Sequence, residues 1–174
     1  MVAFITSMPS GFPGAMSRQA HATVEGQPIN TTTPPLTYGA MVVMDVATGT
    51  IRQATTSDTA GFYGLLVRAY PTQGFGNPVG SLNDPIYPTG VTAPPSTGAA
   101  DVMRRGYMLV KYGGATAPVK GGAANIWTGA TAGGQVQGNV TAVAPGAGTC
   151  VAMPGLTFMT AADGNGIVEV AYNI

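Results

Sequence analysis

The sequence predicts an all-β domain, built as a sandwich or barrel of short antiparallel strands. Three observations predict it. Glycine and proline, with 26 and 14 of the 174 residues, punctuate the chain as turn residues do. The hydrophobic share of 45% excludes an intrinsically disordered chain, which would be poor in apolar residues. The apolar runs are short, and none follows the period of an amphipathic helix. The length suits one domain with its own core.

The first 37 residues differ from the rest. They carry repeated Gly and Pro residues and the run "NTTTPP", in which Pro34 and Pro35 lack a backbone donor and favour extended neighbours. No apolar period runs through this segment. We therefore expect an extended N-terminal arm over residues 1–37 and a β-sandwich core over residues 38–174. A loop lying on its own domain is the alternative for the first segment.

The core begins with strands whose limits are marked by turn residues. "TYGAMVVMDV" (37–46) and "IRQATT" are joined by a short turn around Gly49, which predicts a β-hairpin. "GFYGLLVRAY" (61–70) is apolar on both faces, as in a strand inside a sandwich or an interface. Residues 71–100 form a long Pro/Gly-rich loop. Such loops are usually functional or disordered, and Phe75 and Tyr87 give this one apolar anchors for docking.

The second half of the chain continues the series of short strands. "VMRRGYMLVKYGG" predicts a strand over residues 102–112 that bends at Gly106. Five more runs follow: "NIWTGA", "QVQGNVTAV", "TCVAM", "LTFMT" and "GIVEVAYNI". "ADGNG" between the last two predicts a hairpin turn, because Asp-Gly and Asn-Gly tolerate positive φ. Strands of this length and spacing are typical of sandwiches and barrels.

Composition limits the partners. Charged residues make up 8% of the chain, with seven cations and seven acids, so no basic patch predicts nucleic-acid binding. A surface with so few charges favours association, which indicates copies of the chain or a partner covering it. No apolar run is long enough to cross a bilayer, and the N-terminus lacks the features of a signal peptide. We expect no membrane partner and assembly in a reducing cytosol.

Candidate catalytic and metal-binding residues are few. His21 is the single histidine and Cys150 the single cysteine, too few for a typical zinc site and for an intrachain disulfide. The acids are scattered, and the Gly-rich runs lack the ending of a phosphate-binding loop. We expect no cofactor, no metal and no enzymatic activity. Trp127 is expected in the core, and the Cys150 thiol is expected to be buried and inert.

Several segments carry a resemblance: "PGAMSR", "ATVEGQPI", "YGAMVVMD", "IRQATTSD", "GFYGLLVRAYP", "RRGYMLVKYGG" and the C-terminal "PGLTFMTAADGNGIVEVAYNI". Together they resemble the structural cement proteins that decorate the heads of tailed bacteriophages. The resemblance spans most of the chain and is weakest over residues 71–100. It implies a jelly-roll-like β-sandwich without enzymatic activity. It also implies a virion protein, assembled in the host cytoplasm, that binds the outer surface of the capsid and bridges neighbouring major capsid proteins.

On this resemblance the arm would lie on another subunit, with its charged residues fixing the register. The free arm is expected to be disordered. Arg104 and Arg105 are adjacent in a strand, so at least one of them faces a neighbour or solvent. The candidate capsid-contact residues are Phe12, Met16, Arg18, His21, Glu25, Phe75, Tyr87 and Arg104.

Other functions stay open at this point. The chain could be another virion subunit, such as a tail-tube or head–tail joining protein, for which a cyclic hexamer would be evidence. A carbohydrate-binding virion domain would need exposed aromatic platforms, and an enzyme would need an unrecognised site. The chain is also expected to bind copies of itself, as a dimer or a trimer, and the sequence does not choose between them.

Overall fold

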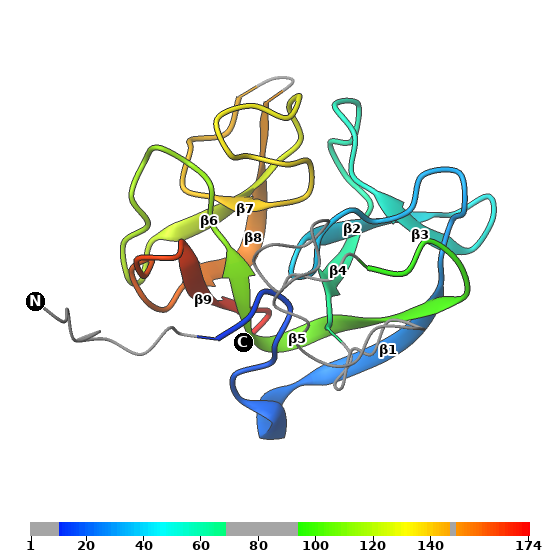
Figure 1. Ribbon diagram of the computed structural model, residues 1–174, viewed down its shortest axis with the longest axis horizontal. Helices are drawn as coiled ribbons and strands as arrows, with labels where there is room; N and C mark the ends of the chain where they lie inside the picture. The colour runs from blue at the N-terminus through cyan, green and yellow to red at the C-terminus, as the bar shows by residue number, and fades with distance from the viewer. Residues whose placement is uncertain (1–10, 69–93, 147–148) are drawn as a thin grey trace, which may run out of the picture.

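The computed structural model describes residues 11–68, 94–146 and 149–174 (Figure 1). It confirms the all-β fold. A short 3-10 turn, η1 (Gln19–His21), is the one helical element in these ranges. The strands in chain order are β1 (Thr23–Pro28), β2 (Met41–Asp45), β3 (Thr50–Gln53), β4 (Phe62–Leu66), β5 (Ala99–Lys111), β6 (Ala123–Trp127), β7 (Val140–Thr141), β8 (Cys150–Phe158) and β9 (Ile167–Tyr172).

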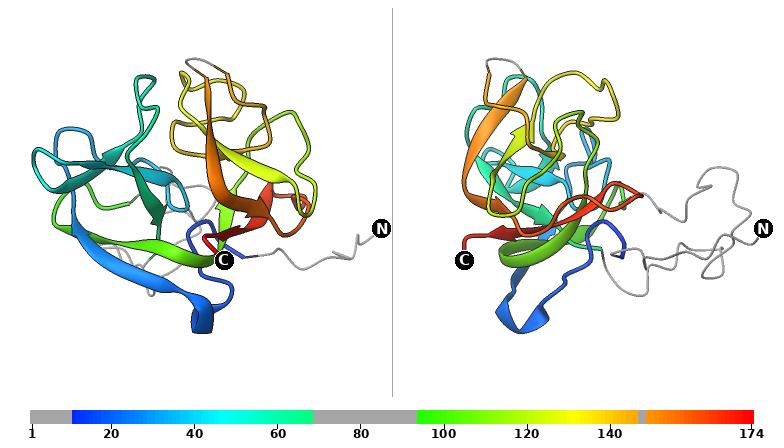
Figure 2. Two further views of the ribbon diagram at one scale, coloured as in Figure 1. Left: turned by 180° about the vertical axis from the view of Figure 1, so that it is seen from behind. Right: turned by 90° about the vertical axis from the view of Figure 1, so that its left-hand side faces the viewer.

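The strands form one curled sheet. Its order is β3-β2-β4-β5-β9-β8-β6-β7, and β1 pairs with β5 beside this path. All the pairings between these strands are antiparallel, as expected for a jelly-roll-like fold. Figure 1 and the left view of Figure 2 show β1–β4 gathered on one side and β6–β9 on the other, with β5 linking the two. The long β5 therefore belongs to both halves of the molecule.

Within β5 the pairing changes at Gly106. The strand pairs with β1 and β4 up to Arg105, and with β9 from Gly106 onward. Gly106 has a φ of +138°, and a Cβ there would lie 3.0 Å from the Cα of Ala22. The sequence placed a bend at this residue. Only glycine accepts both this backbone conformation and the close approach of the chain.

A backbone contact closes the first half of the sheet. Just after β1, Ile29 forms a parallel bridge with Ile51 of β3, and the Asn30 N–H donates to the Ile51 carbonyl at 2.8 Å. Strands β1 to β5 thus form a ring. Its interior holds a cluster of six buried residues: Ile29, Tyr38, Val42, Ile51, Leu66 and Val102.

The larger core extends through both halves. It joins Met41 and Leu65 of the first half to Phe158 and Val170 of the second, and all four are fully buried. Strand β4 contributes to both cores, since Leu65 belongs to the larger cluster and its neighbour Leu66 to the smaller one. This confirms the expectation of a strand buried on both faces.

The predicted turns are present. Gly49, with φ +66°, joins β2 to β3, and the "ADGNG" turn joins β8 to β9. In that turn the Asp163 carboxylate accepts hydrogen bonds from the backbone N–H groups of Asn165 and Ile167 at 2.9 and 2.8 Å. The runs "TCVAM" and "LTFMT" are one strand, β8, instead of two. It continues through Pro154-Gly155, where its register with β6 shifts.

The N-terminal segment differs from the expected free arm. Residues 11–37 combine turns, η1 and strand β1, and they lie on the chain's own domain, as in the alternative, with β1 paired to β5 along six residues. The pairing satisfies backbone groups that an isolated arm would leave to water. The division of the chain at residue 37 stays a prediction. Residues 1–10 and most of the predicted 71–100 loop lie outside the described residues. In the described ranges, no helix is long and apolar enough to cross a membrane.

Candidate functional site

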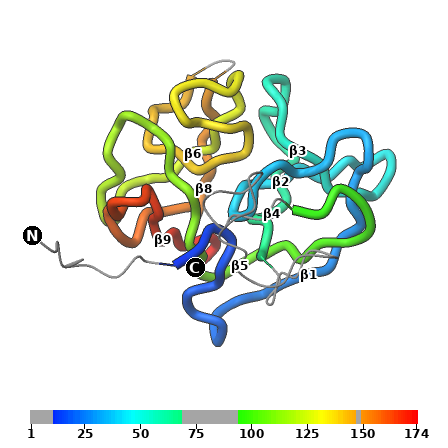
Figure 3. Tube along the Cα trace, viewed as in Figure 1, coloured from blue at the N-terminus to red at the C-terminus, as the bar shows by residue number. Residues whose placement is uncertain are grey.

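The candidate site is built on the N-terminal strap, which we define as residues 11–28. The strap runs antiparallel beside β5, as the dark blue and green tubes show (Figure 3). Before η1, the Gly14 N–H donates to the Leu109 carbonyl at 2.7 Å, and the Leu109 N–H donates to the Ala15 carbonyl at 2.9 Å. The Ser17 N–H donates to the Tyr107 carbonyl at 3.1 Å. The beginning of the strap therefore lies along the second half of β5. The end of the strap, which is strand β1, lies along the first half of β5.

The strap projects one turn away from the sheet. Met16 lies opposite Met108, and Thr23 lies opposite Arg105. Seven residue steps along the strap (16 to 23) thus match three along β5 (108 to 105), which leaves four extra residues. They form the bulge that contains η1, and Arg18, Gln19, Ala20 and His21 are all exposed there.

Arg18 ties this bulge to β9. Its guanidinium lies 3.2 Å from the Glu169 carboxylate, which also accepts a hydrogen bond from the Ser17 hydroxyl at 2.6 Å. The same guanidinium lies 4.1 Å from the centre of the Tyr107 ring, within cation–π distance. The His21 ring meets the Tyr107 ring edge-on at 6.3 Å. Arg18 and His21, two of the predicted contact residues, therefore both contact the Tyr107 ring.

A second group of charges lies along β1. Arg104 of β5 lies 3.7 Å above the Tyr63 ring and 4.0 Å from the Glu25 carboxylate. The Tyr63 hydroxyl donates to Glu25 and accepts from the Gln27 amide at 2.9 Å. The hydrogen bond to Glu25, together with burial and the negative charge of Glu25, raises the pKa of the Tyr63 hydroxyl, while Arg104 opposes the shift. Residues from β1, β4 and β5 are thus joined in one polar group.

Phe12 lies at the start of the strap, next to a third cation. The Arg68 guanidinium is 5.2 Å from the Phe12 ring and 5.7 Å from the Tyr38 ring. Burial raises the pKa of the Tyr38 hydroxyl, and Arg68 opposes the shift. The Phe12 side chain is 58% exposed even so. An exposed aromatic residue on a strap that pairs with the sheet is available to a partner.

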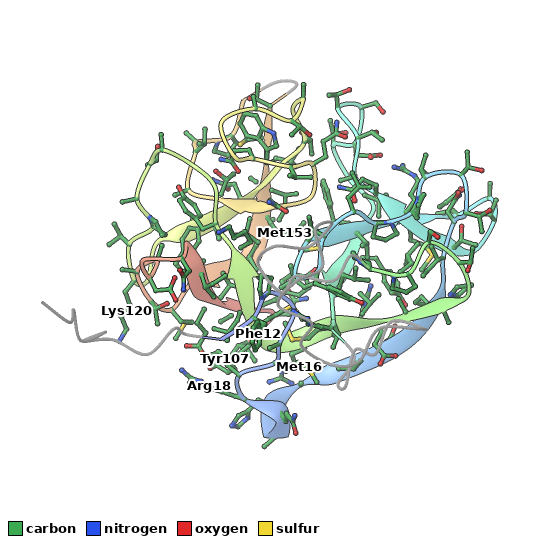
Figure 4. The ribbon with its side chains drawn as sticks, viewed as in Figure 1. Phe12, Met16, Arg18, Tyr107, Lys120 and Met153 are labelled. Carbon is green, nitrogen blue, oxygen red and sulfur yellow. The ribbon has the colours of Figure 1, made fainter. Side chains whose placement is uncertain are left out.

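The structure brings six of the eight predicted contact residues to this region: Phe12, Met16, Arg18, His21, Glu25 and Arg104. Figure 4 shows Phe12, Met16, Arg18 and Tyr107 gathered beside β5 near the bulge that contains η1. Phe75 and Tyr87 lie outside the described residues. Each of the charged residues among the six contacts its own chain, although they were predicted to contact another subunit. Their role in binding stays a prediction.

Three side chains that position the charges were not among the predicted residues: Tyr63, Tyr107 and Glu169. Tyr107 follows Arg105 by two residues, so the period of a strand could have placed the Tyr107 side chain on the same face of β5 as Arg105. Glu169 is far from Arg18 in sequence, and no local pattern joins them. Arg105 is exposed and Arg104 half-buried, which confirms that one of the two faces solvent.

Two further expectations concern Trp127 and Cys150. Trp127 is half-buried and belongs to neither core cluster, so its expected place in the core is wrong. Its indole N–H donates to the Ala130 carbonyl at 3.1 Å, which holds the ring over the following turn. Cys150 is buried as expected, and burial raises the pKa of its thiol, so the reactive thiolate is disfavoured. No group of three metal-binding side chains occurs in the part of the chain that the structure describes.

A family model for the structural cement protein (E217 gp24/Pam3 gp6) matches residues 4–173. The chain belongs to the structural cement protein family. The match covers the strap, β5 and both halves of the sheet. It makes the chain a phage structural protein.

The fold of this cement-family chain is found in a solved structure. A chain of "The capsid of Myoviridae Phage XM1" is similar to it with a TM-score of 0.71 and 17% sequence identity. The alignment covers 98% of this chain and 95% of that chain. At this identity the likeness shows a shared fold. None of the curated proteins matches the sequence.

Proposed function

We propose that the chain binds the outer surface of the phage capsid and stabilises the shell by bridging neighbouring major capsid proteins. The observation that carries the proposal is the match to the structural cement family over nearly the whole chain. The chain would act without enzymatic activity, cofactor, nucleic acid or membrane, as a component of the virion exterior that assembles in the host cytoplasm. It would also contact copies of itself, as a dimer or a trimer.

The strap supports this function as the contact region. It presents Phe12 near its start and Arg18 and His21 on the exposed bulge, and aromatic and arginine side chains are enriched at the centres of protein interfaces. Internal ion pairs hold Arg18 and Arg104 in place. Because these side chains are ordered before binding, less conformational entropy is lost when a partner docks. A shell with many copies multiplies each modest contact by avidity.

The test is co-sedimentation of the purified chain with undecorated shells of its phage. Deleting the strap would remove a paired strand, so substitutions separate binding from folding better. Phe12→Ser removes an exposed aromatic residue of the strap. Val46→Ser is the matched control, since Val46 is 90% exposed in the β2–β3 turn. We expect the full chain to pellet at a fixed copy number per capsid subunit and to raise the melting temperature of the shell.

Phe12→Ser should weaken pelleting, and Val46→Ser should leave it unchanged. If the full chain does not pellet, capsid binding is wrong, and a cyclic hexamer in solution would then favour a tail-tube or head–tail joining subunit. If both variants pellet like the full chain, the shell contact lies away from Phe12. Phe75 and Tyr87 would then be the next residues to replace.

A further inference from the structure

The bulge of the strap and the residue beside it carry positive charges that acidic side chains of the described residues neutralise only in part. We define the turn surface as Arg18, Gln19, Ala20 and His21 of the strap with Arg105 of β5. Arg105 lies opposite Thr23, directly after the bulge, and its side chain is exposed. Among the described residues, the Arg105 side chain makes no hydrogen bond, ion pair or ring contact. Within the described ranges it is a cation without an acidic partner, in a chain that has seven cations.

The acids near the turn surface are already engaged. Glu169 is the acid at Arg18, and its side chain is only 12% exposed, whereas Arg18 is 46% exposed. The Glu169 carboxylate also accepts from Ser17, which leaves little of its charge facing outward. A second acid, Glu25 of the strap, contacts Tyr63 and Arg104. The charge that the turn surface presents to a partner is therefore positive.

We infer that the turn surface docks on an acidic segment of the major capsid protein, with Arg105 pairing a carboxylate there. The inference rests on the proposed capsid binding and names the chemistry of the surface that is bound. Charge complementarity supports it, because interface charges set partner choice and encounter rate. The arginine fork suits a carboxylate through two parallel hydrogen bonds. Tyr107 keeps Arg18 and His21 in place, so the turn surface is formed before docking.

The structure offers a matched control. Lys120 is exposed in the turn before β6 and, like Arg105, makes no ion pair among the described residues. Arg105→Glu and Lys120→Glu change the net charge of the chain equally, but only Arg105 belongs to the turn surface. Arg105→Gln removes the positive charge without adding a negative one. Because neither side chain supports the fold, all three variants should keep the melting temperature of the parent chain.

The experiment measures binding of the four proteins to undecorated shells at low salt and at about 1 M salt, where the screening length falls to about 3 Å. We expect Arg105→Glu to weaken binding about ten-fold at low salt, with Arg105→Gln in between and Lys120→Glu within about two-fold of the parent. High salt should weaken the parent chain more than Arg105→Glu.

Two results would overturn the inference while leaving the proposed function intact. One is unchanged binding of Arg105→Glu to shells that bind the parent chain. The other is an equal loss for Lys120→Glu, which would indicate a general effect of net charge. Failure of the parent chain to bind the shells at all would instead refute the proposed function, and the inference with it.

Discussion

Gly14→Ala should detach the strap from β5, because Gly14 fits a place that no other residue can fill. Its φ is +83°, in the left-handed region that favours glycine. A Cβ at this position would lie 2.8 Å from the Cβ of Tyr38 and 2.9 Å from the backbone nitrogen of Arg68. The Gly14 backbone is also paired on both sides, donating to Leu109 and accepting from Arg68 at 2.8 Å. The side chain of alanine would therefore push against fixed backbone.

Two effects lower the free energy of unfolding of the Gly14→Ala variant. A left-handed conformation costs an L-residue about 1–2 kcal/mol, and overpacking against fixed atoms adds about 1–3 kcal/mol. Gly49→Ala is the control for the first effect. Gly49 has φ +66° in an open turn, and a Cβ there would meet nothing within 4 Å. We expect Gly14→Ala to destabilise the chain by about 3 kcal/mol, against about 1 kcal/mol for Gly49→Ala.

Calorimetry and limited proteolysis provide the assay. For a chain of this size, each kcal/mol lowers Tm by about 2–4 °C, so Gly14→Ala should lower it by about 6–12 °C. Trypsin should also cut faster after Arg18, which lies in the strap, than in the parent chain or in Gly49→Ala. Equal losses of Tm and equal cleavage rates for the two alanine variants would mean that the strap does not pack against β5 at Gly14.

Two further substitutions test the charged contacts. Burial opposes ionisation of Asp58, but two hydrogen bonds from Arg52, at 2.6 and 2.7 Å, help to hold the pKa of its carboxyl below the ordinary value. This stabilisation is present above the unfolded pKa and is lost as pH falls through the folded one. Asp58→Asn should therefore cost about 2 kcal/mol in urea unfolding at neutral pH and much less near pH 3; an equal cost at both would contradict the ionic role. Tyr63→Phe removes the hydroxyl that joins Glu25 to Gln27, and should cost about 1 kcal/mol by thermal unfolding while leaving the aromatic contact to Arg104. No change in Tm would show that this hydroxyl does not stabilise the β1–β4 contact.

Local sequence chemistry predicted much of the fold. Gly49 and the "ADGNG" turn were recognisable because positive φ and short polar side chains are local requirements. Strand β4 was recognisable because both its faces are apolar. The position of β1 was not, since its alternation of exposed and half-buried residues is weak, and Pro34 and Pro35 favoured an arm. The bridge from Ile29 to Ile51 depends on a sequence-distant partner that no local pattern specifies.

The contact residues show the same limit. Arg18, His21 and Glu25 stood out because a chain with 8% charged residues has few of them. Their partners, however, belong to β4, β5 and β9, and only the folded sheet brings these strands next to the strap. The sequence could therefore suggest which strap residues are candidates for contacts. It could not show that each of them contacts a side chain of its own chain.

The placement of charge along the strap follows from the way the strap pairs. A strand's register is held by its ladder, and a slip by one residue would turn every side chain to the opposite face. Between Met16 and Thr23 the strap makes no regular ladder with β5, so backbone pairing fixes the two ends of the bulge and leaves the residues between them to side-chain contacts. The Arg18–Glu169 pair lies within this gap, and the Arg104–Glu25 pair lies just after it. They add side-chain contacts to a segment that has few backbone ones, and Arg105 lies exposed at the end of the same segment.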